Sequence, residues 1–175
     1  EVASKAPETA SAWNAAGTWE EKSMVPWWKD KLALLKAFKA DHHSLRITVD
    51  QLGDVLGEAQ VVHIRGIPRF LFDLRFELDI SCGYPTSSKR YPGKVKVLEF
   101  SNDLAENEDG FPVEVSMADE SDRKAVATAL VPKLQATLKE YVAEYRAQVA
   151  MPEAGAFPGQ LPPAPKAKAA RHDEA

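Results

Sequence analysis

The 175-residue sequence has few of the features that support cross-linking, membrane insertion or secretion. It contains one cysteine, Cys82, so no intrachain disulfide framework can form. No apolar run approaches the roughly 20 residues that a membrane-spanning helix needs. The first residues lack the charged start and apolar centre of a signal peptide. We therefore expect a soluble, cytoplasmic protein.

Motifs of phosphate binding, metal binding and nucleophilic catalysis are also missing. The chain has no glycine-rich loop followed by Lys-Ser or Lys-Thr, no GxGxxG and no nucleophile elbow. Its four histidines have none of the Cys/His spacings typical of zinc sites. We expect a protein that is not an enzyme and that needs no cofactor and no metal. Only a Ser/His/Asp arrangement without a sequence motif of its own stays open.

Charge and composition limit the possible partners and the number of domains. The net charge is −4, so attraction to nucleic acid or to an anionic membrane requires a local basic surface. The length suits one domain, and both ends are rich in small, polar or proline residues without periodicity. We expect a disordered tail at residues 1–12, a folded domain at 13–149 and a Pro/Ala-rich linker or tail at 150–175.

Residues 57–84 organise the expected fold. Apolar residues from Phe70 to Cys82 alternate with mostly polar ones from Arg69 to Ser81, which predicts a long β-strand with one buried and one wet face. The preceding β-branched run, residues 59–65, is separated from it by Gly66, Ile67 and Pro68, so the two should form an antiparallel hairpin. Cys82 falls on the apolar face and should be buried.

Further elements follow from periodicity in the rest of the chain. We expect a helix at about residues 24–40 capped by Ser23, strands at 44–50, 94–100 and 111–117, and an acidic loop at 101–110. An apolar stripe predicts an amphipathic helix over 121–149, which Pro132 should kink or delay. The fold class is α+β: an N-terminal helix, an antiparallel meander sheet of four to five strands, and a long C-terminal helix covering the sheet.

The four tryptophans precede or open the first helix. Trp27 and Trp28 should be core residues, because large aromatic side chains are mostly buried. Trp13 and Trp19 lie outside any periodic element, and two alternatives stay open for them. They are either core anchors or part of a recognition surface.

A local excess of cations on the central strands is the main candidate for function. These residues are Arg65, Arg69, Arg75, Lys89, Arg90, Lys94 and Lys96. One interpretation is an ordinary wet sheet face balanced by Asp73, Glu77 and Asp79. The other is a docking face for an acidic partner. Nucleic acid is a weaker alternative, because the aromatic residues of the long strand face inward and cannot stack on bases.

The order of segments resembles the N-terminal domain of the activator of heat-shock protein 90 ATPase, a co-chaperone family, over roughly residues 11–148. The resemblance rests on Trp13-Asn14, Trp19-Glu20-Glu21-Lys22, Trp27, Asp30-Lys31-Leu32, Gly57-Glu58-Ala59 and the long alternating strand. It implies binding to the middle domain of heat-shock protein 90 and stimulation of the chaperone's ATPase activity. The chaperone's N-terminal domain is left open as a further contact, and we expect a monomer. The alternative is a non-catalytic binding module for another acidic protein or nucleic acid.

Two family motifs match this sequence in part. Trp13, Asn14 and Trp19 match the character of an Asn- and Trp-rich segment tied to ATPase stimulation, whereas Ala15-Ala16-Gly17 departs from it. Where members have Arg-Lys-Gly-Lys in the hairpin, this chain has Ile64-Arg65-Gly66-Ile67. The expected chaperone-binding residues are Arg65, Gly66, Arg69, Arg75, Lys94 and Lys96.

Overall fold

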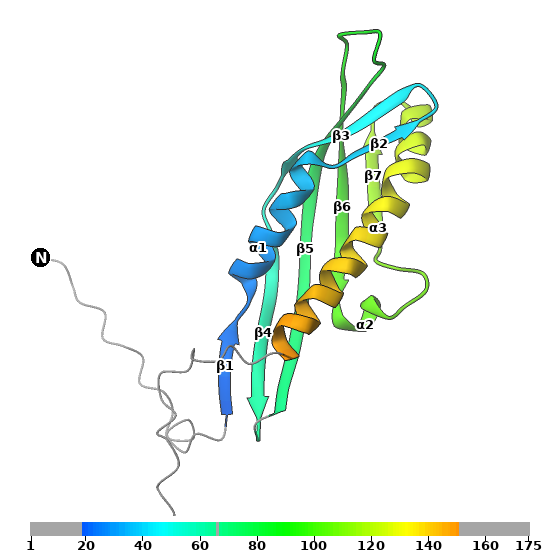
Figure 1. The fold of residues 1–175 in the computed structure, drawn as a ribbon. Helices are drawn as coiled ribbons and strands as arrows, with labels where there is room; N and C mark the ends of the chain where they lie inside the picture. Colours follow the sequence, from blue (N-terminus) through cyan, green and yellow to red (C-terminus); the bar gives the residue numbers. More distant parts are fainter. Residues whose placement is uncertain (1–18, 66, 151–175) are drawn as a thin grey trace, which may run out of the picture.

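The computed structural model describes residues 19–65 and 67–150, which form one antiparallel sheet with helices on one of its faces (Figure 1). The elements are β1 (Trp19–Ser23), α1 (Val25–Ala33), the 3-10 helix η2 (Leu34–Ala37), β2 (Lys39–His42), β3 (Leu45–Leu52), β4 (Leu56–Ile64), β5 (Ile67–Gly83), β6 (Tyr91–Ser101), α2 (Asn102–Ala105), β7 (Val113–Met117) and α3 (Glu120–Ala150). The predicted α+β class, with a short N-terminal helix and a long C-terminal helix, is confirmed.

The 17-residue strand β5 is the centre of the sheet. β4 pairs with its first half and β3 with its last residues, both antiparallel. Because β6 pairs with the middle and end of β5, β3 and β4 must lie end to end along the opposite edge. β2 extends the sheet beyond β3, β1 extends it beyond β4, and β7 extends it beyond β6. A single long strand therefore holds together both ends of the sheet.

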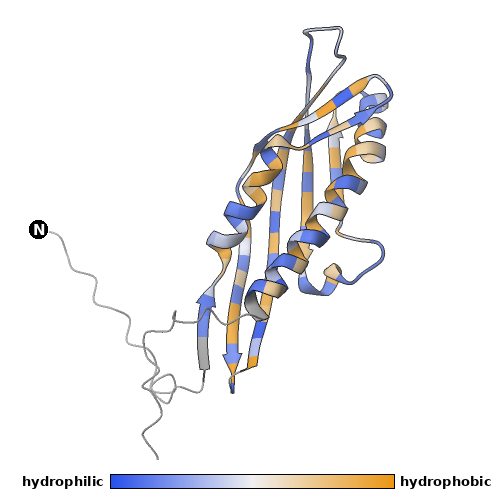
Figure 2. Ribbon diagram, viewed as in Figure 1, coloured by the Kyte–Doolittle hydropathy of each residue, from blue (hydrophilic) through white to orange (hydrophobic). Residues whose placement is uncertain are grey.

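Alternation along β5 separates a dry face from a wet one, as predicted (Figure 2). Every second residue from Phe72 to Cys82 is at most 4% exposed. These side chains pack under α1 and α3, whose buried stripe includes Trp28, Leu134 and Tyr145. Trp28 is fully buried and Trp27 packs at the margin of the core, so the core prediction for this pair is confirmed.

Two short strands, β1 and β2, differ from the sequence-based expectation. The helix expected to reach residue 40 ends earlier, and residues 39–42 pair with β3 as β2. Ser23 is not a helix cap but the last residue of β1, and Met24 takes the N-cap position without a side-chain cap. Trp19 begins β1, so it does not lie outside regular structure. Backbone pairing with β3 overrides the helical spacing expected up to residue 40, and pairing with β4 makes a strand of residues 19–23, where no periodic element was expected.

The long helix α3 begins at Glu120, twelve residues before Pro132, and continues through it to Ala150. The expected delay of its start is therefore wrong. The expected acidic loop is also incomplete, because its residues 102–105 form α2. No described helix has the length and apolar character to cross a membrane. The expected tails at 1–12 and 150–175 lie outside the described residues, apart from Ala150.

Candidate docking surface on the open face of the sheet

The face of the sheet away from the helices carries exposed leucines. Leu71 of β5 is 50% exposed and occupies a position at which the alternation otherwise places polar residues. Leu56 pairs with Arg75 across β4 and β5, and it is 51% exposed. A register shift opposite Arg75 leaves both Leu98 and Glu99 of β6 exposed between two buried residues. Leu56, Leu71 and Leu98 are thus exposed leucines on three adjacent strands, and each has apolar surface left to bury against a partner.

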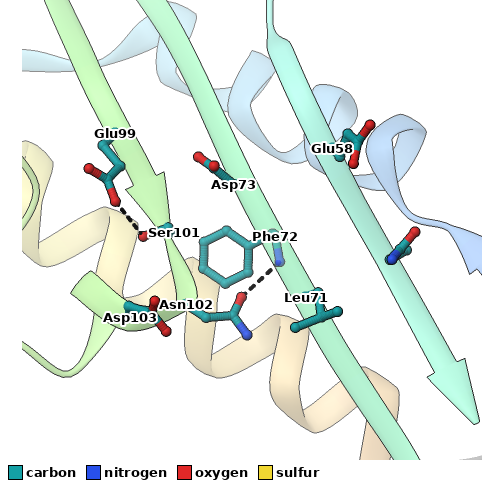
Figure 3. A pocket seen from close by; sticks show the side chains of 9 residues that line it. Glu58, Leu71, Phe72, Asp73, Glu99, Ser101, Asn102 and Asp103 are labelled. Carbon is teal, nitrogen blue, oxygen red and sulfur yellow. Dashed lines mark hydrogen bonds between the residues drawn. The ribbon is translucent and has the colours of Figure 1, made fainter.

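A hollow that includes Leu71 is lined with carboxylates (Figure 3). Its lining residues are Glu58, Gln60, Leu71, Phe72, Asp73, Glu99, Ser101, Asn102 and Asp103. Sheet register creates the cluster, because Glu58 and Ser101 pair with Asp73 from the two neighbouring strands. None of the four carboxylates forms an ion pair with a described residue, and Glu99 accepts a hydrogen bond from the Ser101 hydroxyl. The hollow therefore has uncompensated negative charge.

Asn102 fixes the floor of this hollow. β6 ends at Ser101, and the Asn102 side chain then continues the ladder along β5. The Phe72 N–H donates to Asn102 Oδ1 at 2.8 Å (Figure 3). Asn102 Nδ2 donates to the Phe70 carbonyl at 2.7 Å. One amide side chain thus satisfies a backbone donor and a backbone acceptor where the next strand residue is missing.

The cations expected to form one docking face fall into two groups. Arg65, with φ 53°, occupies the hairpin turn, and Arg69 pairs with Val62 on the open side of β5; both arginines are exposed. Lys94 instead forms ion pairs with Glu77 at 3.1 Å and Asp79 at 3.6 Å. Its hydrogen bond to Glu77, with the charges of Glu77 and Asp79, raises the pKa of Lys94. The open face is therefore not uniformly basic.

The other predicted positions differ in how far they can be described. Arg75 and Lys96 are exposed, and Lys96 stands in register between Glu77 and Glu114. Gly66, Trp13 and Asn14 lie outside the described residues, as does the side chain of Trp19. The acidic hollow was missed in the sequence. Its one available signal was Leu71, an apolar residue in the polar series.

Among residues 19–65 and 67–150, no group of three or more His, Cys, Asp or Glu side chains is placed to hold a metal ion. The four carboxylates of the hollow form a charged surface. Together with the leucines, they suit contact with a protein surface that is apolar and basic.

Comparisons with known proteins agree on one family. The family model described as activator of Hsp90 ATPase, N-terminal, matches residues 21–149. The Hsp90 co-chaperone HCH1 of Saccharomyces cerevisiae is 27% identical over 135 residues, which is 70% of this chain and 84% of that protein. The crystal structure of Aha-1 from Plasmodium falciparum superposes with a TM-score of 0.59 at 21% identity, covering 74% of this chain and 87% of that one.

The human Aha1 N-terminal domain, solved in solution, superposes with a TM-score of 0.52 at 24% identity, covering 74% of this chain and 95% of that one. At these identities the two structures support the fold, and the family model supports the membership. The match over residues 21–149 includes all of the described sheet from Glu21 onward together with α3 up to Val149. The chain belongs to the family of the N-terminal domain of the activator of Hsp90 ATPase.

Proposed function

We propose that this protein is a co-chaperone that binds Hsp90 through the open face of its sheet. Family membership and the similarity to a yeast protein named as an Hsp90 co-chaperone support the partner. The observation that supports the surface is the hollow, which is lined by Leu71 and by four carboxylates that form no ion pair with a described residue. Leu56 and Leu98 are exposed on the two neighbouring strands. Exposed apolar side chains beside charges of one sign suit a protein surface that is apolar and oppositely charged.

The charges of this surface indicate which residue types a complementary surface on the chaperone must present. The hollow calls for Lys or Arg side chains flanked by apolar residues, whereas the exposed Arg65 and Arg69 call for carboxylates. We propose the middle domain of Hsp90 as the partner that presents this pattern. Binding there precedes any effect on ATP turnover, and the chemistry belongs to the chaperone.

We further propose that the segment containing Trp13, Asn14 and Trp19 stimulates the ATPase activity. β1 pairs with β4 so that Trp19 is opposite Ile64, next to Arg65 in the hairpin turn. The chain before β1 therefore starts from the hairpin end of the sheet. A segment tethered there can act on a second surface of the chaperone while the sheet holds the first.

Substitution of single leucines by alanine tests the binding surface. Leu71→Ala should weaken binding to the isolated Hsp90 middle domain by about fivefold, because a half-exposed leucine has about 1 kcal/mol of apolar burial left to gain. Leu34→Ala is the matched control, since Leu34 is 60% exposed on η2 and lies away from the hollow. Equal affinities of the two variants by calorimetry would refute docking at Leu71.

Charge reversal tests the hollow independently. Asp103→Lys should reduce affinity for the same middle domain, whereas Asp30→Lys, an exposed change on α1, should leave it nearly unaltered. Tighter binding by Asp103→Lys would mean that the partner surface is acidic. That result would favour the alternative, in which Arg and Lys side chains of the open face bind an acidic partner.

Removal of residues 1–18 tests stimulation without cutting into β1. We expect the shortened protein to retain its affinity for the middle domain and its melting temperature, and to lose stimulation of full-length Hsp90. Only differential binding to the hydrolysing state can shift the chaperone's conformational equilibrium. If binding and melting temperature fall together, the deleted residues belong to the folded domain, and the separation of binding from stimulation is refuted.

A further inference from the structure

The loop that joins β5 to β6, residues 84–90, is the part of the described sheet farthest from the hairpin turn. It projects beyond the ends of both strands (Figure 1). β5 has 17 residues, so at a rise of about 3.3 Å per residue its two ends are about 50 Å apart. The loop therefore cannot belong to a contact confined to Arg65 and the acidic hollow.

This loop is basic in an acidic protein. No Asp or Glu occurs between Asp79 and Glu99, although this stretch contains Lys89, Arg90, Lys94 and Lys96. Lys94 is compensated by Glu77 and Asp79. Neither Lys89 nor Arg90 forms an ion pair with a described carboxylate, so both retain uncompensated charge.

Arg90 is held in place by neutral groups. Its Nε donates to the Ser81 hydroxyl at 3.1 Å, and Nη2 donates to the Ser81 hydroxyl at 2.6 Å, to the Ser81 carbonyl at 3.2 Å and to the Thr48 hydroxyl. Ser81 is only 8% exposed, although it belongs to the wet series of β5, so it is a firm anchor. Nη1 makes no hydrogen bond to a described residue and keeps its donors for another group.

Exposed tyrosines flank these cations. Tyr84 is 47% and Tyr91 37% exposed, and the Lys89 ammonium lies 5.1 Å from the centre of the Tyr91 ring. Arg and Tyr are enriched among the residues that dominate binding energy at protein interfaces. An arginine that is already ordered loses less conformational entropy on binding than a free one.

We propose that residues 84–91 form a second docking site, for an acidic segment of a partner protein. Carboxylates of that segment pair with the free donors of Arg90 and with Lys89, and Tyr84 and Tyr91 cover its apolar atoms. A nucleic-acid strand fits less well, because Lys89 already covers one ring and the protein carries a net charge of −4. This site is separate from the proposed contact at the hollow.

Titration with a peptide tests this second site in the absence of Hsp90. A negative result would therefore refute the second site and leave the proposed binding to Hsp90 unaffected. The probe is a dodecapeptide of glutamate and serine, added to the ¹⁵N-labelled protein. We expect amide shifts at residues 84–91, Thr48 and Ser81. Shifts confined to residues 64–69 around the hairpin turn, or no shifts, would overturn the proposal.

Paired variants then measure the effect of the two cations. Lys89→Gln/Arg90→Gln should weaken peptide binding about tenfold, the size expected for charge-assisted hydrogen bonds. The control Lys29→Gln/Lys36→Gln makes the same change in net charge at exposed positions of α1 and η2 and should bind as the parent does. Lys89→Gln alone should cause part of the loss, without disturbing the contacts of Arg90. Equal affinity of both double variants, or tighter binding of an oligothymidylate of the same charge, would refute an acidic protein segment as the ligand.

Discussion

Asn102→Ala tests whether one side chain holds the β5 backbone beside the hollow. The change removes two hydrogen bonds, at 2.8 Å to the Phe72 N–H and at 2.7 Å to the Phe70 carbonyl. Each contributes about 0.5–1.5 kcal/mol net, and water entering the half-buried hollow replaces part of them, so we expect a loss of about 1–2 kcal/mol. For a domain of this size that lowers the melting temperature by roughly 3–10 °C.

Asn102→Asp makes the test sharper. The carboxylate can still accept from the Phe72 N–H, but it places an oxygen against the Phe70 carbonyl and a fifth negative charge in the hollow. It should be less stable than Asn102→Ala at pH 7, and the difference should shrink as the pH falls toward about 4, where a protonated carboxyl can donate.

Calorimetry and amide hydrogen exchange measure these changes. The control is Asn107→Ala, because the Asn107 side chain is exposed and makes no hydrogen bond to a described residue. Exchange at the Phe72 amide should accelerate in both Asn102 variants and stay unchanged in the control. A melting temperature within about 1 °C of the control, with Phe72 still protected, would refute the reasoning.

Three further outcomes follow from the same surface and core. Arg65→Ala should weaken binding to the Hsp90 middle domain by roughly 1–3 kcal/mol in calorimetry, with the melting temperature unchanged because Arg65 is exposed; equal binding would make it an ordinary solvated residue. The dissociation constant should rise with salt, since exposed charges are screened beyond about 8 Å, and a constant value between low and high salt would contradict this. Burial raises the pKa of Tyr145 to about 12, and burial together with the charge of Asp122 raises the pKa of Cys82 to about 11. As the pH rises, the unfolded chain releases these protons before the folded one does, so the free energy of unfolding should fall from about pH 9 to 12. In urea unfolding, the free energy of Tyr145→Phe should fall less steeply above about pH 10 than that of the parent. Equal slopes for the two proteins would contradict the raised pKa of Tyr145.

Long periodic elements could be predicted from the sequence, and short ones could not. β5 and α3 present many repeats of their own period, so their type and buried faces are visible before any contact is known. β1 has five residues and β2 has four, and their sequences WEEKS and KADH show no usable alternation. These strands form because β4 and β3 have unpaired backbone edges with which they can pair. That pairing depends on the tertiary structure and cannot be seen in the local sequence.

The hollow was beyond prediction for a related reason. Its carboxylates come from β4, β5, β6 and α2, which are up to 45 positions apart between Glu58 and Asp103. Register brings Glu58, Asp73 and Ser101 into one row, and the register shift near Arg75 turns Glu99 outward. A sequence pattern gives the face of each residue but not its cross-strand neighbours. The hairpin cations could be found because they are close in sequence.

Compensation of charge differs between the two halves of the open face. Around Glu77 and Asp79, Lys94 neutralises its neighbours, and Lys96 lies in register with Glu77 and Glu114. In the hairpin half, Arg65 and Arg69 and the four carboxylates of the hollow have no ion-pair partner among the described residues. Unpaired charge steers a partner during association, whereas a paired set contributes little field. The hairpin half should therefore set the orientation of the partner, and because it holds both signs in a fixed order, a reversed orientation would bring like charges together.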